Sequence, residues 1–186
     1  MRIISGQFRH RLLKRPPSDT TRPTSDRARE AVFNILIHTY GVEFQDCVVL
    51  DVFAGSGAMG FEALSRGAKQ VYFVENNKQA IRCIQENSTT LGADEKVHLL
   101  RGDAPQIKKA PDGGAHVIIM DPPYNQGLIL PTCAQLYKQG WINPDTLVCI
   151  ESSLTDCPAH IPHLTKKEQR IYGAAAISFW VEEKET

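Results

Sequence analysis

The stretch CVVLDVFAGSGAMG, residues 47–60, joins a continuous apolar run to a glycine-rich turn. A run of this length predicts a central strand that is buried on both faces of a parallel sheet. Its glycines, Gly55, Gly57 and Gly60, have the spacing G-x-G-x-x-G, which is typical of a turn that leads into a helix and approaches a nucleotide-like cofactor. The stretch therefore predicts an α/β fold with a cofactor site at the end of this strand.

Short β-rich runs alternate with helical patterns along the rest of the chain. We expect further strands at residues 70–75, 96–103, 116–124 and 146–152, helices that end at Gly67 and Gly92, and a final antiparallel pair in QRIYG (169–173) and AAISFWVE (175–182). Strands separated by helices imply parallel crossovers. The expected fold is a Rossmann-like, doubly wound, mostly parallel seven-stranded sheet with an antiparallel C-terminal strand pair.

Length and composition are those of an ordinary globular protein. The 186 residues are 42% hydrophobic and 23% charged, so we expect a single domain over residues 1–186. No segment approaches the roughly 20 apolar residues that span a bilayer, and no signal peptide is evident, so we expect a cytoplasmic protein without membrane contact. The five scattered cysteines are expected to be reduced.

The first 29 residues are strongly basic although the whole chain has a net charge of zero. They hold eight Lys and Arg against two Asp, a net charge of +6, so the remainder carries −6. We expect a basic N-terminal arm over residues 1–23, containing a short β-hairpin, followed by a helix at about 25–39. A basic arm on an acidic body suggests contact with phosphates, although a solvated surface hairpin explains the same pattern.

Four acidic residues, Asp51, Glu75, Asp103 and Asp121, each end a predicted strand. In open α/β sheets ligands bind at these carboxyl ends, so the acids should rim one crevice. A dinucleotide fits the glycines and Glu75. However, a carboxylate about 5 Å from a phosphate charge would be repelled by about 3 kcal/mol at an effective dielectric of about 20. S-adenosylmethionine carries a cationic amino group and a sulfonium and no phosphate, so Asp51 favours it.

This pattern resembles the cofactor motifs of class I methyltransferases. By that resemblance Asp51, Gly55 and Gly57 hold the methionine end of S-adenosylmethionine, Glu75 holds the ribose and Asp103 lies near the adenine. The cofactor-binding residues that the resemblance implies are Asp51, Phe53, Gly55, Gly57, Glu75, Asn76, Asp103 and Ala104.

The tetrapeptide DPPY, residues 121–124, ends the fourth predicted strand. It resembles the [N/D/S]-P-P-[Y/F/W] motif of methyltransferases that act on exocyclic amines of nucleobases or on glutamine. Such a nitrogen is a poor nucleophile, and an acceptor aimed at its N–H localises the lone pair. Asp121 and the Pro122 carbonyl could supply acceptors that the stiff Pro122–Pro123 backbone holds in place, while Tyr124 stacks on the base.

Nearly the whole chain resembles the bacterial 16S ribosomal RNA guanine-N2 methyltransferases. The matching stretches are MRIISGQFR, RPTSDRAREAVFNIL, DVFAGSGAMGFEALSRGA, VYFVENN and DPPY, and His10 stands where the family pattern has a glycine. The resemblance implies methyl transfer from S-adenosylmethionine to a guanine N2 amine in small-subunit rRNA, in an assembling 30S particle, by a monomer. The residues expected to contact RNA phosphates are Arg9, Arg11, Lys14, Arg15 and Arg22.

The sequence alone leaves three other functional hypotheses open. DPPY also fits transfer to DNA or to protein glutamine, although no separate base-recognition domain is visible in 186 residues. A non-catalytic RNA-binding assembly factor could keep the same fold. Cys157, His160 and His163 lie close together in sequence, but no fourth residue has a metal-ligand spacing, and we expect no metal site.

Overall fold

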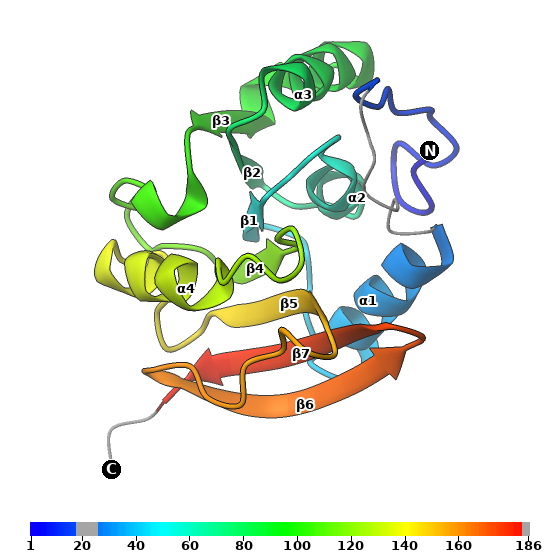
Figure 1. The fold of residues 1–186 in the computed structure, drawn as a ribbon. Helices are drawn as coiled ribbons and strands as arrows, with labels where there is room; N and C mark the ends of the chain where they lie inside the picture. Colours follow the sequence, from blue (N-terminus) through cyan, green and yellow to red (C-terminus); the bar gives the residue numbers. More distant parts are fainter. Residues whose placement is uncertain (18–25, 184–186) are drawn as a thin grey trace.

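The structure, a computed structural model, describes residues 1–17 and 26–183. Its helices and strands alternate along the chain (Figure 1). The helices are α1 (Asp26–His38), α2 (Ala58–Ser65), α3 (Lys78–Leu91) and α4 (Ile129–Lys138), with short 3₁₀ turns η1 (Asp94–Lys96) and η2 (Ala104–Gln106). The strands are β1 (Val48–Val52), β2 (Gln70–Glu75), β3 (Val97–Arg101), β4 (Val117–Met120), β5 (Leu147–Ser153), β6 (Leu164–Tyr172) and β7 (Ala175–Glu182).

The strands form one seven-stranded sheet in the order β3-β2-β1-β4-β5-β7-β6. The pairs β3–β2, β2–β1, β1–β4 and β4–β5 are parallel, and β7 runs antiparallel to both β5 and β6. The strand order reverses between β1 and β4, which makes their carboxyl ends the switch point where such sheets bind ligands. The expected fold class, including the antiparallel C-terminal pair, is confirmed.

The two faces of the sheet bury two separate apolar clusters. One cluster packs α1, α2 and α3 against one face, and the other packs α4 and η2 against the opposite face (Figure 1). Between β3 and β4 the chain forms only η2 instead of a longer helix.

The element boundaries agree with the sequence-based expectations to within a few residues. The largest difference is at β6, which begins at Leu164 and not at residue 169. The strand expected within 116–124 is β4, which ends at Met120 because Pro122 and Pro123 cannot donate to a strand ladder. Gly92 caps α3 in the left-handed conformation, with φ 65°, as its position predicted. The helix expected at about 25–39 is α1, which covers Asp26–His38.

The N-terminal arm folds back on itself through one antiparallel bridge, Arg2 to Leu12. His10 turns the chain with a φ of 69°, in the left-handed region that favours glycine. This conformation explains why the family pattern has a glycine there. Arginines 9 and 11 flank the turn, so its geometry decides how the arm presents them.

A buried carboxylate fastens the arm to α2. Glu62 is fully buried and accepts hydrogen bonds from the backbone N–H groups of Ile4 at 2.8 Å and Ser5 at 3.1 Å. Arg66 donates to the same carboxylate at 2.9 Å, and the guanidinium of buried Arg29 lies 3.8 Å from it. Buried charges need partners of this kind, so the start of the arm is an integral part of the fold.

A second buried polar side chain fastens the end of the arm. Asn87 in α3 accepts from the Lys14 N–H at 2.7 Å and donates to the carbonyl oxygens of Lys14 at 3.1 Å and Ser56 at 3.2 Å. Ser56 belongs to the glycine-rich turn, so one amide group joins the arm, α3 and that turn. Arg11 adds a hydrogen bond to the Thr90 carbonyl at 2.8 Å.

The described cysteines are all free thiols, as expected, and four of the five are buried. Burial raises the pKa of the Cys133 thiol to about 12. Of the helices in residues 1–17 and 26–183, none is both long and apolar enough to cross a membrane.

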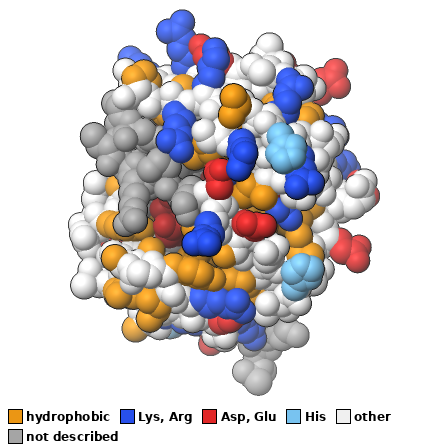
Figure 2. All heavy atoms as spheres, turned by 90° about the vertical axis from the view of Figure 1, so that its right-hand side faces the viewer, with side chains coloured by type: hydrophobic (Ala, Val, Ile, Leu, Met, Phe, Trp, Pro, Cys, Tyr) orange, Lys and Arg blue, Asp and Glu red, His pale blue; other side chains and the backbone are white. Residues whose placement is uncertain are grey.

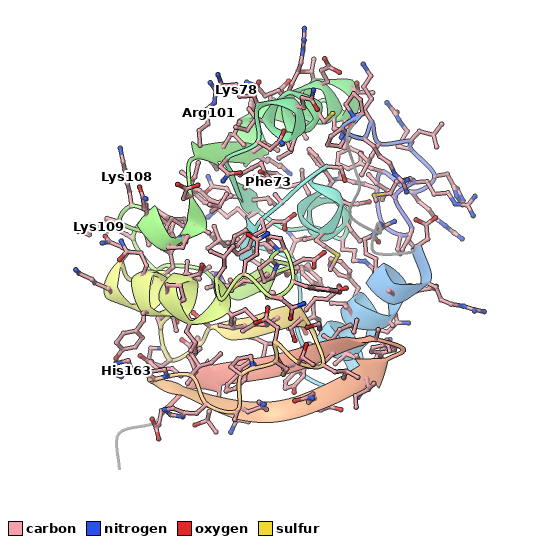
Figure 3. All side chains as sticks on the ribbon, viewed as in Figure 1. Phe73, Lys78, Arg101, Lys108, Lys109 and His163 are labelled. Atoms are coloured by element: carbon pink, nitrogen blue, oxygen red, sulfur yellow. The ribbon has the colours of Figure 1, made fainter. Side chains whose placement is uncertain are left out.

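Gly60 is required by close packing of α2 on the sheet. A Cβ atom at this position would lie 2.6 Å from Cζ of Phe73 and 2.7 Å from Cγ1 of Val71 (Phe73 is labelled in Figure 3). We predict that Gly60→Ala lowers the free energy of unfolding by about 1–3 kcal/mol through overpacking. Denaturant unfolding followed by circular dichroism measures this change.

The matched variant is Phe73→Leu, which removes the ring that the new methyl group would meet. We expect the double variant Gly60→Ala/Phe73→Leu to lose less stability than the sum of the two single variants. Strictly additive losses would show that the Phe73 ring is not what excludes a side chain at position 60.

Candidate active site

The switch point between β1 and β4 gathers the residues that the sequence analysis singled out. Asp51 is the second-to-last residue of β1, Phe53 directly follows that strand, and Asp121 directly follows β4. Glu75 ends β2, the strand next to β1 on the other side. Neighbouring parallel strands thus bring three carboxylates to one edge of the sheet.

The glycine-rich turn is held by the carboxylate of Glu75. Its Oε2 accepts from the Gly55 N–H at 2.7 Å, and its Oε1 accepts from the N–H groups of Asn76 at 2.9 Å and Asn77 at 2.8 Å. Gly55 has a φ of 55° and no atom near its missing Cβ, so its backbone faces open space. A ligand can therefore approach this backbone closely.

A cavity of about 340 Å³ lies beside this turn. Its lining includes five of the predicted cofactor residues, namely Phe53, Glu75, Asn76, Asp103 and Ala104. The Asn76 amide donates to the Asp103 carboxylate at 2.7 Å across the mouth of the cavity. Asp51, Gly55 and Gly57 are not part of this lining, so the cavity contains the predicted ribose and adenine end of the site.

Asp51 is the buried acid of the site. Only 4% of the residue is exposed, and its Oδ2 accepts from the Gly60 N–H at 2.8 Å, near the start of α2. Burial raises the pKa of Asp51 well above the ordinary aspartate range, the Gly60 N–H opposes this, and the charges of Asp121 and Glu75 raise it further. A bound cation would relieve this repulsion.

The DPPY segment follows β4 as an irregular loop that turns toward β5. Tyr124 is 41% exposed, and its hydroxyl donates to Oε1 of Glu151 in β5 at 3.1 Å. The next residue, Asn125, has a φ of 59°, and its N–H donates to Asp156 at 2.9 Å. These contacts give Tyr124 a defined position with its ring accessible to a ligand.

Glu151 is the site residue that sequence reasoning missed. It lies near the carboxyl end of β5, as Asp51 lies near the carboxyl end of β1. The run TLVCIES contained the signal, because its acid follows a buried apolar strand as the other strand-end acids do. It was not counted among the acids that rim the crevice.

Four of the residues expected to contact RNA phosphates are described, and all four are exposed, namely Arg9, Arg11, Lys14 and Arg15. Figure 2 looks onto this side of the molecule, and Lys and Arg side chains are spread over it with several acidic side chains among them. Lys14 forms an ion pair with Glu86 in α3 at 3.0 Å, and Arg11 contacts α3 as described above. Arg22 lies outside the described residues.

The residues of the CPAHIPH segment do not form a cluster of metal ligands. The ring of His163 stacks on Tyr137 with ring centroids 4.2 Å apart, and the Cys157 thiol donates to Gln169 (His163 is labelled in Figure 3). Within the described part of the chain, no group of three or more His, Cys, Asp or Glu is arranged to hold a metal ion.

Comparison with known proteins identifies the family of this chain. Residues 1–181 match the family model described as conserved hypothetical protein 95. Ribosomal RNA small subunit methyltransferase D of Haemophilus influenzae is 36% identical over 155 residues, which cover 82% of this chain and 78% of that protein. The chain belongs to this methyltransferase family. The family resemblance predicted from the sequence is thereby confirmed.

Other members of the family agree in sequence and fold. The methyltransferase D of Escherichia coli is 34% identical over 87% of this chain and 79% of its own length. The solved structure of the putative methyltransferase yhhF from Escherichia coli has a TM-score of 0.85 and 31% identity, and covers 100% of this chain and 99% of that one. A putative methylase from Haemophilus influenzae has a TM-score of 0.79 at 29% identity, covering 99% of both chains.

The raised pKa of Asp51 leads to a prediction about stability and binding. In Asp51→Asn the amide oxygen can still accept from the Gly60 N–H, but the buried charge is gone. An acid with a raised pKa stabilises the fold at low pH, and this contribution is lost as the pH rises through the raised value. We therefore expect the melting temperature of Asp51→Asn to exceed that of the wild type at pH 8, and the difference to vanish near pH 4.

The same variant should bind S-adenosylhomocysteine at least about 30-fold more weakly in calorimetry, because the ligand's amino group loses its carboxylate partner. Glu95→Gln, in the exposed turn η1, serves as the control and should change neither property. A variant that is less stable than the wild type at pH 8, or that binds equally well, would contradict this account of Asp51.

Proposed function

We propose that this protein transfers a methyl group from S-adenosylmethionine to the exocyclic N2 amine of a guanine in small-subunit ribosomal RNA. The observation that carries the proposal is the DPPY segment at the carboxyl end of β4, beside the glycine-rich turn and its cavity. Its relatives are named as ribosomal RNA small subunit methyltransferases, which supports RNA as the substrate. We take the substrate to be an assembling 30S particle, and the enzyme to be a cytoplasmic monomer of one domain.

The donor set of the crevice fits S-adenosylmethionine. Asp51, with the backbone of Gly55 and Gly57, would hold the cationic methionine end, while Glu75 and Asn76 would hold the ribose. Phe53, Asp103 and Ala104 line the cavity and would contact the adenine there. Because Glu75 also fixes the turn through three backbone hydrogen bonds, ribose binding would build on a carboxylate that is already oriented. When bound, the cofactor supplies an electrophilic methyl group.

The protein's own contribution to the reaction would be to hold the amine. The side chain of Asp121 and the carbonyl of Pro122 accept hydrogen bonds from the N–H groups and so localise the nitrogen lone pair toward the methyl group. Two prolines and the contacts of Tyr124 and Asn125 fix this loop before the substrate arrives. Acceptors that are preorganised in this way need no rearrangement during the reaction, which is where electrostatic catalysis is largest.

The exposed ring of Tyr124 can stack on the base, which is worth roughly 1–3 kcal/mol per base. That gain offsets part of the few kcal/mol needed to turn a paired base out of its helix. The arm would contact phosphates nearby and orient the protein on the RNA without reading its sequence.

The test of the function compares the wild type with Asp121→Ala. We expect the wild type to bind S-adenosylmethionine and not NAD in calorimetry, and to transfer tritiated methyl groups to unmodified small-subunit RNA or particles. Asp121→Ala should keep its cofactor affinity and lose transfer by about 10²–10³-fold or more, as when one preorganised hydrogen-bonding group is removed. Nuclease digestion and mass spectrometry then identify the methylated base.

Parallel assays with DNA and with protein substrates separate the other acceptors of a DPPY enzyme. Transfer to one of these and not to RNA would overturn the proposal, as would NAD binding without S-adenosylmethionine binding. Full transfer activity in Asp121→Ala would overturn the role of that carboxylate. Support of particle assembly without any methyl transfer would identify a non-catalytic assembly factor.

The arm leads to a separate prediction about RNA affinity. Arg11 and Lys14 already contact α3, so Arg9 and Arg15 are the better candidates for phosphate contacts. Each lost phosphate contact lowers the slope of log affinity against log salt by about 0.7 on single strands. For Arg9→Ala/Arg15→Ala we expect the slope to fall by about 1–2 in filter binding to small-subunit RNA. Lys109→Ala removes an exposed cation that follows η2 and lies on the far side of the molecule from the arm (Figure 3), so it should leave the slope unchanged. An unaltered slope in the double variant would exclude these contacts.

A further inference from the structure

Glu151 stands beside Asp121 because of the register of their strands. Met120, the last residue of β4, is paired with Ile150 of the parallel strand β5, so Asp121, which directly follows β4, comes next to Glu151 of β5. The Asp121 N–H still donates to the Val52 carbonyl of β1 at 3.4 Å, so the backbone keeps the direction of the strand at this residue. Side chains at paired positions of parallel strands point to the same face of the sheet. Burial raises the pKa of the Cys149 thiol, and the negative charges of Glu151 and Asp121 raise it further. This agrees with both carboxylates lying on the same face of the sheet as Cys149.

A second observation ties Glu151 to the predicted base-stacking residue. The Tyr124 hydroxyl donates to Oε1 of Glu151 at 3.1 Å, so this carboxylate lies against the ring that the base would contact. A carboxylate can accept about four hydrogen bonds, so the bond to Tyr124 does not prevent it from accepting another. The crevice thus offers two adjacent acceptor groups, Asp121 and Glu151, next to one aromatic ring.

Guanine has the complementary pattern on its Watson–Crick edge. Its N1–H and its N2 amine are adjacent donors, whereas adenine has an acceptor at N1 beside its amine. Enzymes that act on an extruded base read it through hydrogen bonds to this edge and through stacking. A site with two acidic acceptors side by side matches two adjacent donors and opposes an acceptor.

We propose that Glu151 accepts the N1–H of the target guanine while Asp121 and the Pro122 carbonyl accept the N2–H groups, so that Glu151 selects guanine. This inference rests on the proposed function and adds the group that distinguishes guanine from other amine-bearing bases. Glu151 has a second effect, since it also holds the hydroxyl of Tyr124 and thereby the plane of the stacking ring.

The test uses 2-aminopurine, which keeps the 2-amino group of guanine but has an acceptor at N1. Small-subunit RNA is prepared with guanine or 2-aminopurine at the methylated position, and kcat and KM for methyl transfer are measured on both. We expect the wild type to prefer guanine by at least about 10²-fold in kcat/KM, because N1 of the analogue is an acceptor that faces the Glu151 carboxylate and leaves both groups unpaired.

The deciding variant is Glu151→Gln, which keeps the size of the side chain but can donate to N1 of 2-aminopurine. We expect its kcat/KM on guanine to fall, and its ratio of 2-aminopurine to guanine activity to rise at least about 10-fold over the wild type. Tyr124→Phe tests the hydrogen bond between Tyr124 and Glu151 separately from the contact of Glu151 with the base, since this variant removes only the hydroxyl. It should lower both activities in proportion and leave the ratio unchanged.

Glu95→Gln is the matched control and should behave as the wild type. Melting temperature and S-adenosylhomocysteine affinity, unchanged in Glu151→Gln, would show that fold and cofactor site are intact. An unaltered substrate ratio in Glu151→Gln, or an equal change in Tyr124→Phe, would overturn the assignment of Glu151 while leaving the proposed function standing. Failure of the wild type to methylate the guanine RNA would instead contradict the proposed function, and this inference with it.

Discussion

The candidate site depends on one carboxylate that accepts three backbone hydrogen bonds. Glu75 binds the N–H groups of Gly55, Asn76 and Asn77, and so joins the turn after β1 to the turn after β2. This carboxylate therefore sets the position of both turns beside the cavity. Hydrogen bonds to a charged acceptor are roughly twice as strong as neutral ones, which suits them to hold a glycine-rich segment with a high conformational entropy cost.

The parallel topology places four carboxylates close together, and the backbone hydrogen bonds of Glu75 offset only part of their repulsion. It brings Glu75, Asp51, Asp121 and Glu151 to the carboxyl ends of four neighbouring strands, β2, β1, β4 and β5. Glu75 is balanced by backbone donors, but Asp51 has one, and its raised pKa reflects the charges beside it. Such a row of acids is unfavourable toward phosphates inside the crevice and favourable toward a small cation and toward N–H groups. The arm carries exposed basic residues outside the crevice, and we propose that the RNA backbone contacts them.

The sequence predicted the parts of the protein that are encoded in short, local patterns. Alternating apolar runs located the strands, and the prolines of DPPY explain why β4 ends before residue 124. It could not predict contacts between distant segments. In the sequence, Glu62 looks like an ordinary exposed acid on a helix. In the structure it is fully buried, and its carboxylate accepts hydrogen bonds from the backbone N–H groups of Ile4 and Ser5. Glu151 becomes a site residue only through its register with β4, which no local pattern specifies.

The arm and the glycine-rich turn are held by the same two helices, α2 and α3. Glu62 lies in α2, which begins directly after the glycine-rich turn, and Asn87 bonds both to Lys14 in the arm and to the Ser56 carbonyl in that turn. The arm is therefore held by the same elements that shape the cofactor turn. A buried amide that loses one partner leaves a polar group unsatisfied, which costs about 1–3 kcal/mol. Displacing the arm would therefore leave the Asn87 amide, which also bonds to the glycine-rich turn, without its partners on Lys14. The arm and the candidate cofactor site therefore form one structural unit.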